Sequence, residues 1–252
     1  MSAFRVVIPA RFASTRLPGK ALLPMAGKPM IQWVCERAGR SRATEVIVAT
    51  DDSRIANAAR LSGAQVEMTA ATHVSGTDRI AEVARTRGWR AAEIVVNVQG
   101  DEPLIPPALI DQVAGLLHAN AEAHMATLST PLARLEDLLD PNVVKVVAGA
   151  SGRALYFSRA PIPWHRDTAP AGLASQATFA GARRHIGIYA YRVGALLQLA
   201  SLPATPLESA EKLEQLRALE NGFEIRVADS AEPAGPDVNT PEDVERVLKH
   251  LR

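Results

Sequence analysis

FRVVIPARFASTRLPGK (residues 4–20) joins a short apolar run, which Pro9 closes, to a loop of small residues and cations. The run from Arg5 to Ile8 predicts the first strand of the chain. Beyond it, strand-like runs alternate with helix-like stretches through the first half of the sequence. This β-α-β-α order predicts an α/β fold with a mostly parallel sheet and helices on both of its faces. A binding site is then expected at the carboxyl ends of the strands.

Turn and cap residues divide the rest of the chain into elements. Strands are predicted at 45–50, 65–68 and 94–98, the last an unbroken apolar run around Asn97 that is typical of a strand buried on both faces. Helices are predicted at 30–40, at 53–61 after an Asp52 cap, at 77–87 with Thr77 as its cap, and from Pro106-Pro107 onward. After about residue 125 the pattern loosens into predicted strands at 125–130, 143–147, 154–157 and 186–191, a loop or lid at 164–184, and helices at 208–220 and from Thr240 onward.

Composition narrows the class of protein. The chain has 252 residues, 47% of them hydrophobic and 22% charged, and a net charge of +1. A charge so close to zero argues against a broad surface for nucleic acid or anionic lipid. No run of about 18 apolar residues is present to span a membrane, and Arg5 and Pro9 interrupt what would be the core of a signal peptide. The single cysteine, Cys35, excludes an intrachain disulfide and predicts a buried thiol in a reducing compartment, so we expect a cytoplasmic protein.

The first loop concentrates positive charge. No acidic residue precedes Glu36, so five cations are unopposed in sequence: Arg5, Arg11, Arg16, Lys20 and Lys28. Cations just beyond a first strand favour a polyanion site, and a nucleoside triphosphate is the natural candidate. Ser14, Thr15 and Gly19 would bring hydroxyl and backbone N–H groups close to phosphate oxygens. Neither a Walker loop nor a Gly-x-Gly-x-x-Gly fingerprint occurs, which argues against a nicotinamide oxidoreductase.

Four further segments carry residues of possible chemistry, each with a plainer structural alternative. Asp101 leaves the strand at 94–98 through Gly100, where it would hold Mg²⁺ beside phosphates or simply form a turn. Arg79, just after Thr77, would pair with a substrate carboxylate or lie exposed beside a helix cap. His185 and Tyr189 have even spacing on one strand, so they face the same way and would meet a hydroxylated, anionic ligand or pack in the core. Acidic and amide side chains within one turn of the helix at 208–220 would accept sugar hydroxyls or face solvent: Glu211, Glu214 and Gln215.

Nine segments, in this order, resemble the CTP:3-deoxy-manno-octulosonate cytidylyltransferases, or CMP-Kdo synthetases. They are Ile8-Pro-Ala-Arg-Phe-Ala-Ser-Thr-Arg-Leu-Pro-Gly-Lys20, Gly27-Lys-Pro-Met30, Val48-Ala-Thr-Asp51, Ser75-Gly-Thr77, Val96-Asn-Val-Gln-Gly-Asp-Glu-Pro103, Ala154-Leu-Tyr-Phe-Ser-Arg159, His185-Ile-Gly-Ile-Tyr189, Leu213-Glu-Gln-Leu-Arg217 and Thr240-Pro-Glu-Asp243. The first loop alone indicates only a nucleotidyltransferase. The fifth, sixth and seventh segments together point to this family.

The resemblance implies a Rossmann-like nucleotidyltransferase sheet with a smaller antiparallel portion for sugar binding and dimerisation. It implies a single domain over 1–252, in which residues from about 125 to 200 contribute the lid and the dimer contact. It also implies a cytoplasmic, Mg²⁺-dependent homodimer that transfers CMP from CTP to the anomeric hydroxyl of Kdo, for lipopolysaccharide biosynthesis.

The resemblance also assigns roles to residues. Lys20, Arg11 and Asp101 would be catalytic. The nucleotide would contact Ala10, Arg11, Ser14, Lys20, Ser75, Thr77, Gln99 and Asp101. The sugar would contact Arg79, Gln99, Arg159, His185, Tyr189, Glu214 and Gln215. The metal would be held by Asp101 and Asn239.

Asn239 departs from the family pattern. The family has an aspartate there, in Val-Asp-Thr-Pro-Glu-Asp, whereas this chain reads Val238-Asn-Thr-Pro-Glu-Asp243. An amide offers a carbonyl oxygen without charge, so weaker Mg²⁺ binding is expected, and Asp237 is placed to compensate. Two alternatives stay open: a cytidylyltransferase for another acidic sugar such as sialic acid, and a CTP-binding regulator that has lost turnover.

Overall fold

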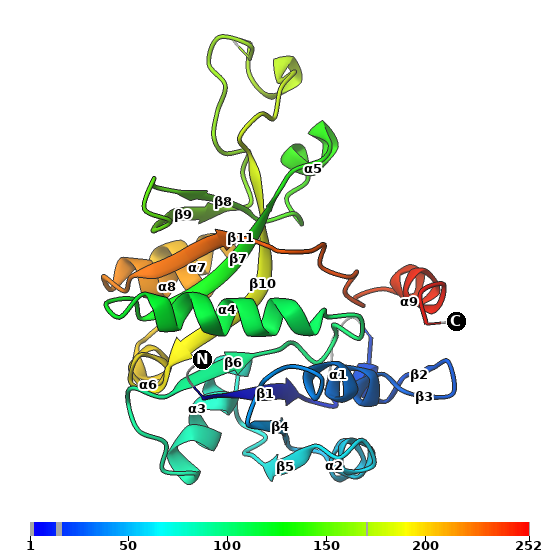
Figure 1. Ribbon diagram of the computed structural model, residues 1–252. Coiled ribbons are helices and arrows are strands. Elements are labelled where there is room, and N and C mark those ends of the chain that lie inside the picture. Colours follow the sequence, from blue (N-terminus) through cyan, green and yellow to red (C-terminus); the bar gives the residue numbers. More distant parts are fainter. Residues whose placement is uncertain (1–2, 14–16, 170, 252) are drawn as a thin grey trace.

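The computed structural model describes residues 3–13, 17–169 and 171–251. Nine strands of this part of the chain form one sheet (Figure 1). They are β1 (Phe4–Ala10), β4 (Glu45–Thr50), β5 (Gln65–Met68), β6 (Ile94–Asn97), β7 (Met125–Pro131), β8 (Lys145–Ala148), β9 (Ala154–Ser158), β10 (Arg183–Arg192) and β11 (Ile225–Asp229). β2 (Pro24–Met25) and β3 (Lys28–Pro29) pair separately as a small hairpin.

The order of the main path is β11-β7-β10-β6-β1-β4-β5. β6, β1, β4 and β5 are mutually parallel, and β11 is parallel to β7. β10 runs antiparallel to both of its neighbours, β6 and β7. β8 and β9 form an antiparallel extension that joins the sheet through β10. The prediction of a mostly parallel sheet with a smaller antiparallel portion is confirmed.

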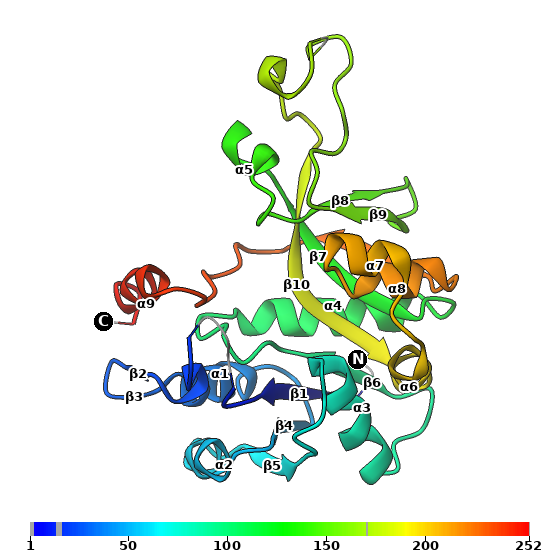
Figure 2. The ribbon, with the colours of Figure 1, turned by 180° about the vertical axis from the view of Figure 1, so that it is seen from behind.

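Helices cover both faces of the sheet, as Figures 1 and 2 show from opposite sides. α1 (Met30–Ala38), α2 (Ser53–Arg60) and α4 (Pro107–Ala119) pack on one face. α3 (Gly76–Thr86), α6 (Val193–Ser201) and α8 (Gln215–Glu220) pack on the other. The remaining helical segments of the described chain are η1 (Lys20–Leu22), α5 (Leu135–Leu139), η2 (Leu173–Ser175), α7 (Pro206–Glu211) and α9 (Pro241–Leu248).

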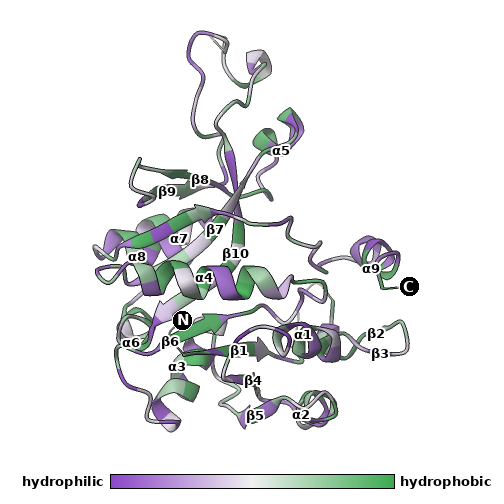
Figure 3. Cartoon of the chain, viewed as in Figure 1, coloured by the Kyte–Doolittle hydropathy of each residue, from purple (hydrophilic) through white to green (hydrophobic). Residues whose placement is uncertain are grey.

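Alternation along the central strands builds both cores. On β1, Val6 and Ile8 enter the layer with α1 and α4, whereas Val7 enters the layer with α3. β6 is likewise buried at every residue, and its hydrophobic start is green in Figure 3. Each fully buried Val or Ile side chain contributes about 1.5–3 kcal/mol of transfer free energy. Cys35 is buried in the α1 layer, as predicted.

Two local predictions were wrong. The predicted helix at 208–220 is two helices, because Lys212 adopts a left-handed conformation (φ 53°, ψ 45°) between α7 and α8. Thr77 does not cap α3. Ser75 does, with its hydroxyl accepting from the Asp78 N–H at 3.1 Å while the Asp78 carboxylate accepts from the Ser75 N–H at 3.2 Å. Sequence spacing could not separate two hydroxyl residues, only two positions apart, that both suit a cap.

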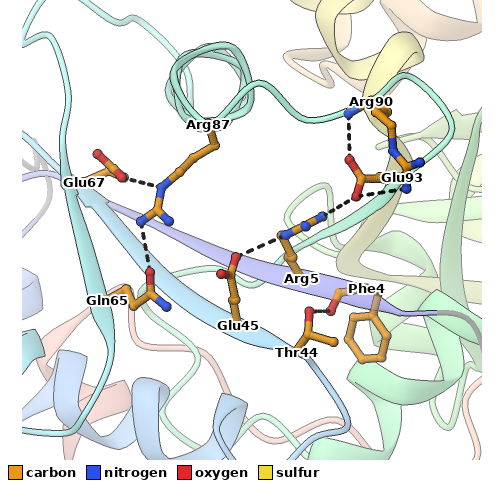
Figure 4. Close-up of polar contacts among 9 residues, drawn as sticks. All are labelled: Phe4, Arg5, Thr44, Glu45, Gln65, Glu67, Arg87, Arg90 and Glu93. Carbon is orange, nitrogen blue, oxygen red and sulfur yellow. Dashed lines mark hydrogen bonds and ion pairs between the residues drawn. The ribbon is translucent and has the colours of Figure 1, made fainter.

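The cluster of cations expected near the first loop is smaller than the sequence indicated. Arg5 pairs with Glu45 and Glu93, both at 3.1 Å, in the network of Figure 4. Lys28 pairs with Glu36 at 2.5 Å. The acids that neutralise these two cations are distant in sequence or follow the loop. Arg5 and Lys28 are therefore paired in the folded structure, although no acid precedes Glu36 in the sequence. Arg16, Ser14 and Thr15 lie outside the described residues.

The segment before β10 extends away from the sheet. Between β9 and β10 the chain forms a long excursion with η2 near its end, seen at the top of Figure 1. β10 begins at Arg183, so the last two residues of the predicted loop at 164–184 are strand instead. They pair with β7, and this long-range pairing is not visible in the composition of the segment itself. A lid role for the excursion stays a prediction.

The C-terminal segment returns to the beginning of the chain. After β11 it crosses to α9, which packs with Met25, Met30, Leu104 and Val238 in a cluster of its own. Gly235 is required at the crossing, because a Cβ there would lie 2.6 Å from the Leu104 Cβ. This return brings residues 237–239 beside the loop that follows β1.

Candidate active site

A first cavity of about 280 Å³ opens at the carboxyl ends of β1 and β6. Its third wall is the loop that leads into α3. The fold thus places the cavity where a mostly parallel sheet is expected to bind ligands. Six of the residues predicted to contact the nucleotide line it: Ala10, Arg11, Lys20, Ser75, Gln99 and Asp101. Ser14 lies outside the described residues, and Thr77 lines a second, adjoining cavity instead.

Lys20 is the centre of the charged end of the first cavity. Its ammonium donates to Asp101 Oδ2 at 2.5 Å, to the Val238 carbonyl at 2.9 Å and to Asn239 Oδ1 at 3.3 Å. Three oxygen atoms from two distant segments therefore face one cation. The two residues predicted to hold a metal are brought together at this point.

Close backbone approach makes this convergence possible. A Cβ on Gly100 would lie 3.0 Å from the Pro9 carbonyl oxygen, so only glycine lets the loop after β6 pass β1 so tightly. The Val238 N–H then donates to the Asp101 carbonyl at 2.9 Å, which ties the returning C-terminal segment to the same loop. The Gly-Asp pair that the sequence singled out is therefore a packing requirement as well as a source of a carboxylate.

Negative charge gathers behind Asp101. Burial, with the nearby carboxylates of Asp101 and Asp237, raises the pKa of Glu102 to about 8. Glu102 is therefore mostly protonated at neutral pH in this state. Asp237 also accepts a hydrogen bond from Asn239 Nδ2 at 2.5 Å, which turns the amide oxygen of Asn239 toward Lys20. Asp237 and Asn239 thus lie on the same side of the extended segment.

The side chains around Lys20 offer Mg²⁺ only a small number of oxygen ligands. It offers the Asp101 carboxylate and the Asn239 amide oxygen, and Mg²⁺ is usually held by one or two carboxylates together with substrate phosphates. Within residues 3–13, 17–169 and 171–251 there is no group of three or more His, Cys, Asp or Glu side chains placed to hold a metal without such help. The residues present fit an ion that arrives with phosphates.

A second cavity of about 260 Å³ adjoins the first, and Gly76 and Gln99 line both. It lies on the sheet face covered by α3 and α8, between β6 and β10. Five of the residues predicted to contact the sugar line it: Gln99, His185, Tyr189, Glu214 and Gln215. Residues separated by more than a hundred positions therefore meet in one site.

The polar groups of the second cavity carry little charge. Burial, aided by Arg184, lowers the pKa of His185 to about 3, so this imidazole is neutral at physiological pH. Its Nε2 lies 2.9 Å from the Thr127 hydroxyl. Burial raises the pKa of Glu214, whose carboxyl group accepts a hydrogen bond from the Thr77 hydroxyl. Neutral imidazole, hydroxyl, amide and carboxyl groups suit the recognition of a polyhydroxylated ligand.

Two arginines predicted to contact the sugar are placed elsewhere. Arg79 is 3% exposed, lines the first cavity, and donates to Asp51 at 3.2 Å and to Thr69. Arg159 Nε donates to the Glu211 carbonyl at 2.6 Å, so both lie off the wall of the second cavity. Glu211 itself binds Ser158 at 2.6 Å instead of facing Glu214 and Gln215, because the chain breaks at Lys212.

Sequence reasoning missed two buried polar residues of the second cavity. Asn97 and Tyr191 both line it, and each is buried. A signal was present for both. Asn97 is the polar exception in the apolar run of β6, and Tyr191 continues the even spacing of His185 and Tyr189.

Among the described residues, every helix is too short or too polar to cross a membrane.

Comparison with known proteins decides the family. A model described as cytidylyltransferase matches residues 5–225. The chain belongs to the cytidylyltransferase family. This cytidylyltransferase is 58% identical over 247 residues to a 3-deoxy-manno-octulosonate cytidylyltransferase of Cellvibrio japonicus, covering 97% of this chain and 96% of the relative. It is 56% identical over 250 residues to the protein of that name from Pseudomonas fluorescens, covering 99% and 98%.

Solved structures agree with that assignment. The cytidylyltransferase described here resembles a CMP:2-keto-3-deoxy-manno-octonic acid synthetase complexed with CTP, with a TM-score of 0.87 and 41% identity over 99% of this chain and 98% of the other. A 4-diphosphocytidyl-2C-methyl-D-erythritol synthase shares the fold at a TM-score of 0.64 and 11% identity, with all of both chains covered. The roles of individual residues in this cytidylyltransferase stay predictions.

Proposed function

We propose that this cytidylyltransferase transfers CMP from CTP to the anomeric hydroxyl of 3-deoxy-manno-octulosonate (Kdo), releasing pyrophosphate and giving CMP-Kdo for lipopolysaccharide biosynthesis. The observation that carries the proposal is the pair of adjoining cavities. One holds Lys20, Arg11 and Asp101, as a triphosphate site needs, and the other holds neutral polar groups suited to a sugar. Relatives of that name support the choice of substrates.

The first cavity would bind CTP through its phosphates. Arg11 and Lys20 offset the negative charge of the triphosphate and the further charge that builds on departing pyrophosphate. Ser75 and the N-terminus of α3 lie beside the cytidine, where free backbone N–H groups can be met by base or phosphate oxygens. The α-phosphorus would then lie near Gln99, which both cavities share.

The second cavity would hold Kdo with its anomeric hydroxyl toward the nucleotide. His185, Tyr189, Glu214 and Gln215 orient the sugar by hydrogen bonds. The anomeric oxygen attacks the α-phosphorus in line, its proton is lost to solvent, and the bond to the bridging oxygen of pyrophosphate breaks. No covalent intermediate on the protein is needed.

We further propose that Mg²⁺ is the cofactor and that Asp101 and Asn239 hold it together with CTP phosphates. The convergence of Asp101 Oδ2 and Asn239 Oδ1 on the Lys20 ammonium supports this assignment. When bound, Mg²⁺ would lower the pKa of the attacking hydroxyl and neutralise phosphate charge.

One experiment tests the function directly. The purified protein is incubated with CTP, Kdo and Mg²⁺, and CMP-Kdo is sought by mass, with pyrophosphate measured in parallel. Omission of each component in turn is the control. Replacing Kdo by sialic acid tests the acidic-sugar alternative. If CMP-sialic acid forms and CMP-Kdo does not, the choice of sugar is wrong, but the proposed transfer of CMP from CTP still holds.

A second candidate is a CTP-binding regulator without turnover. The observation that favours it is Asn239, which removes a charge from the place where the family has an aspartate. CTP binding measured by calorimetry, with no pyrophosphate released in either Mg²⁺ or Mn²⁺, would support this candidate against the enzyme.

We also propose a homodimer that works in the cytoplasm. Large apolar side chains are exposed on the antiparallel extension and on the excursion beyond it: Leu155, Trp164 and Leu173. Exposed apolar side chains on these segments favour a contact with a second copy. A cytoplasmic location follows from the proposed use of CTP.

A further inference from the structure

Asn97 is a polar residue in a strand that is otherwise apolar. It ends β6, is 3% exposed, and lies opposite Val7 on β1 and Tyr189 on β10. Because side chains alternate along a strand, Asn97 faces the same side as Val95, which packs in the α3 and α6 layer. β-branched residues fill the rest of the strand, so an amide at this position is unexpected.

The amide oxygen of Asn97 has no hydrogen-bond partner among the described residues. A buried carbonyl without a partner destabilises a fold, since it has lost its contacts with water and gained none. Asn97 also lines the second cavity, so its side chain lies beside a space that a ligand can fill.

Tyr189 repeats the observation on the neighbouring strand. Its hydroxyl is buried and without a partner in the same described set, and it lines the same cavity. The register places Tyr189 directly across from Asn97. An acceptor and a donor on adjacent strands, both unsatisfied, therefore flank one part of the cavity.

We propose that Asn97 binds the acceptor sugar. Its Oδ1 accepts a hydrogen bond from one sugar hydroxyl, and that hydroxyl accepts a hydrogen bond from Tyr189. A hydroxyl group matches this pair because it both donates and accepts, whereas a methylene group in its place would leave both protein groups unpaired. Asn97 thereby selects for a hydroxyl at one position of the sugar. This inference rests on the proposed function.

The first test replaces Asn97 with the nearly isosteric leucine. Asn97→Leu is expected to raise the KM for Kdo about tenfold, as the loss of one buried hydrogen bond predicts, with the KM for CTP unchanged. The midpoint of thermal unfolding without ligands should stay equal or rise, because an unpaired carbonyl oxygen has been removed. A purely structural role predicts a lower midpoint with both KM values changed together or neither changed, and that result would overturn the inference.

Val95→Ala is the matched control. Val95 lies two residues earlier on the same face and does not line the cavity. Its truncation should lower the unfolding midpoint and leave the KM for Kdo unchanged. If Asn97→Leu fails to fold, Asn97→Ala takes its place in the same measurements.

The second test uses the wild-type enzyme with Kdo analogues that each lack one non-anomeric hydroxyl. One analogue is expected to lose about tenfold in kcat/KM on the wild type and to lose nothing further on Asn97→Leu. Equal losses on both enzymes for every analogue would overturn the inference. A wild type that does not turn over Kdo would instead overturn the proposed function, so the two failures are distinguishable.

Discussion

Asn239 shows how one residue can set the affinity of the proposed metal site. Its neutral amide oxygen stands where the resemblance implies a carboxylate, and Asp237 supplies negative charge one step farther away through the hydrogen bond from Asn239 Nδ2. Charge that acts through an amide attracts a cation less strongly than a carboxylate in direct contact, because Coulomb energy falls with distance.

Asn239→Asp is therefore expected to lower the Mg²⁺ concentration for half-maximal rate by about tenfold at saturating CTP. The measurement is a Mg²⁺ titration of pyrophosphate release. Asn57→Asp adds the same charge on the exposed side of α2, outside both cavities, and should leave the titration unchanged. An unchanged midpoint for Asn239→Asp would show that this residue does not hold the metal.

His185 makes the stability of the protein depend on pH. The pKa of His185 is about 3 in the folded state, below the ordinary value of 6.5. Between pH 3 and pH 6.5 the imidazole is therefore protonated in the unfolded chain but not in the folded chain. Stability from this group is present above pH 6.5 and is lost as the pH falls, by roughly 2 kcal/mol at pH 5.

His185→Gln should therefore flatten the fall in stability between pH 7 and pH 5. The check is the urea midpoint of unfolding at both values. His250→Gln, which changes an exposed imidazole beyond α9, should keep the wild-type difference. If His185→Gln loses as much stability on acidification as the wild type, the imidazole is not the group responsible.

Among the elements, the N-terminus of α3 contributes both to the stability of the fold and to the wall of the first cavity. Ser75→Ala removes a capping box and should cost about 1 kcal/mol of the free energy of unfolding. It should also weaken CTP binding measured by calorimetry, because Ser75 lines the first cavity. Asp52→Ala removes the comparable cap of α2, which touches neither cavity, and should lower stability alone. Equal CTP affinity in the wild type and Ser75→Ala would remove Ser75 from the nucleotide site.

The joint between α7 and α8 is held in a costly conformation. Lys212 is left-handed, which disfavours residues that carry a Cβ by about 1–2 kcal/mol. Lys212→Gly should relieve part of that cost and raise the free energy of unfolding by about 0.5 kcal/mol, since glycine also loses more freedom on folding. Lys212→Ala keeps the Cβ and should give no gain. A gain of equal size in both variants would assign the effect to the lost ammonium group.

Elements were predictable where their signals are local. β4 and β5 match the predicted ranges because turn and helix-cap residues bound each of these short runs closely. The start of α9 follows from Thr240-Pro241 with acids in the first turn. The break at Lys212 was missed, since the apolar spacing of Leu213, Leu216 and Leu219 fits one continuous helix equally well. The left-handed backbone of Lys212 interrupts that helix, and the spacing of apolar residues does not predict it.

For the whole molecule, the class of fold was predictable but the order of strands was not. β10 inserts between β6 and β7, and this long-range pairing brings His185 and Tyr189 to Gln99. The resemblance likewise assigned Arg79 and Arg159 to the sugar, whereas their acceptors lie in segments that sequence reasoning did not connect to them. A site assembled from distant loops depends on these tertiary partners.

Assembly is the property of the whole molecule that can be tested most simply. Leu155 on β9 is 61% exposed, on the antiparallel extension from which the long excursion departs (Figure 1). A charge there would have to be buried against a second copy, which is strongly unfavourable. Leu155→Glu is therefore expected to convert the proposed dimer to a monomer in light scattering.

Leu61→Glu is the control for that experiment. Leu61 is more exposed, at 82%, but it follows α2 at the far end of the sheet, so its change should leave the mass unaltered. The comparison separates a contact surface from general solubility, because both variants add one negative charge at an exposed leucine. A dimer that persists in Leu155→Glu would exclude β9 from the interface, and a monomeric wild type would exclude the dimer itself.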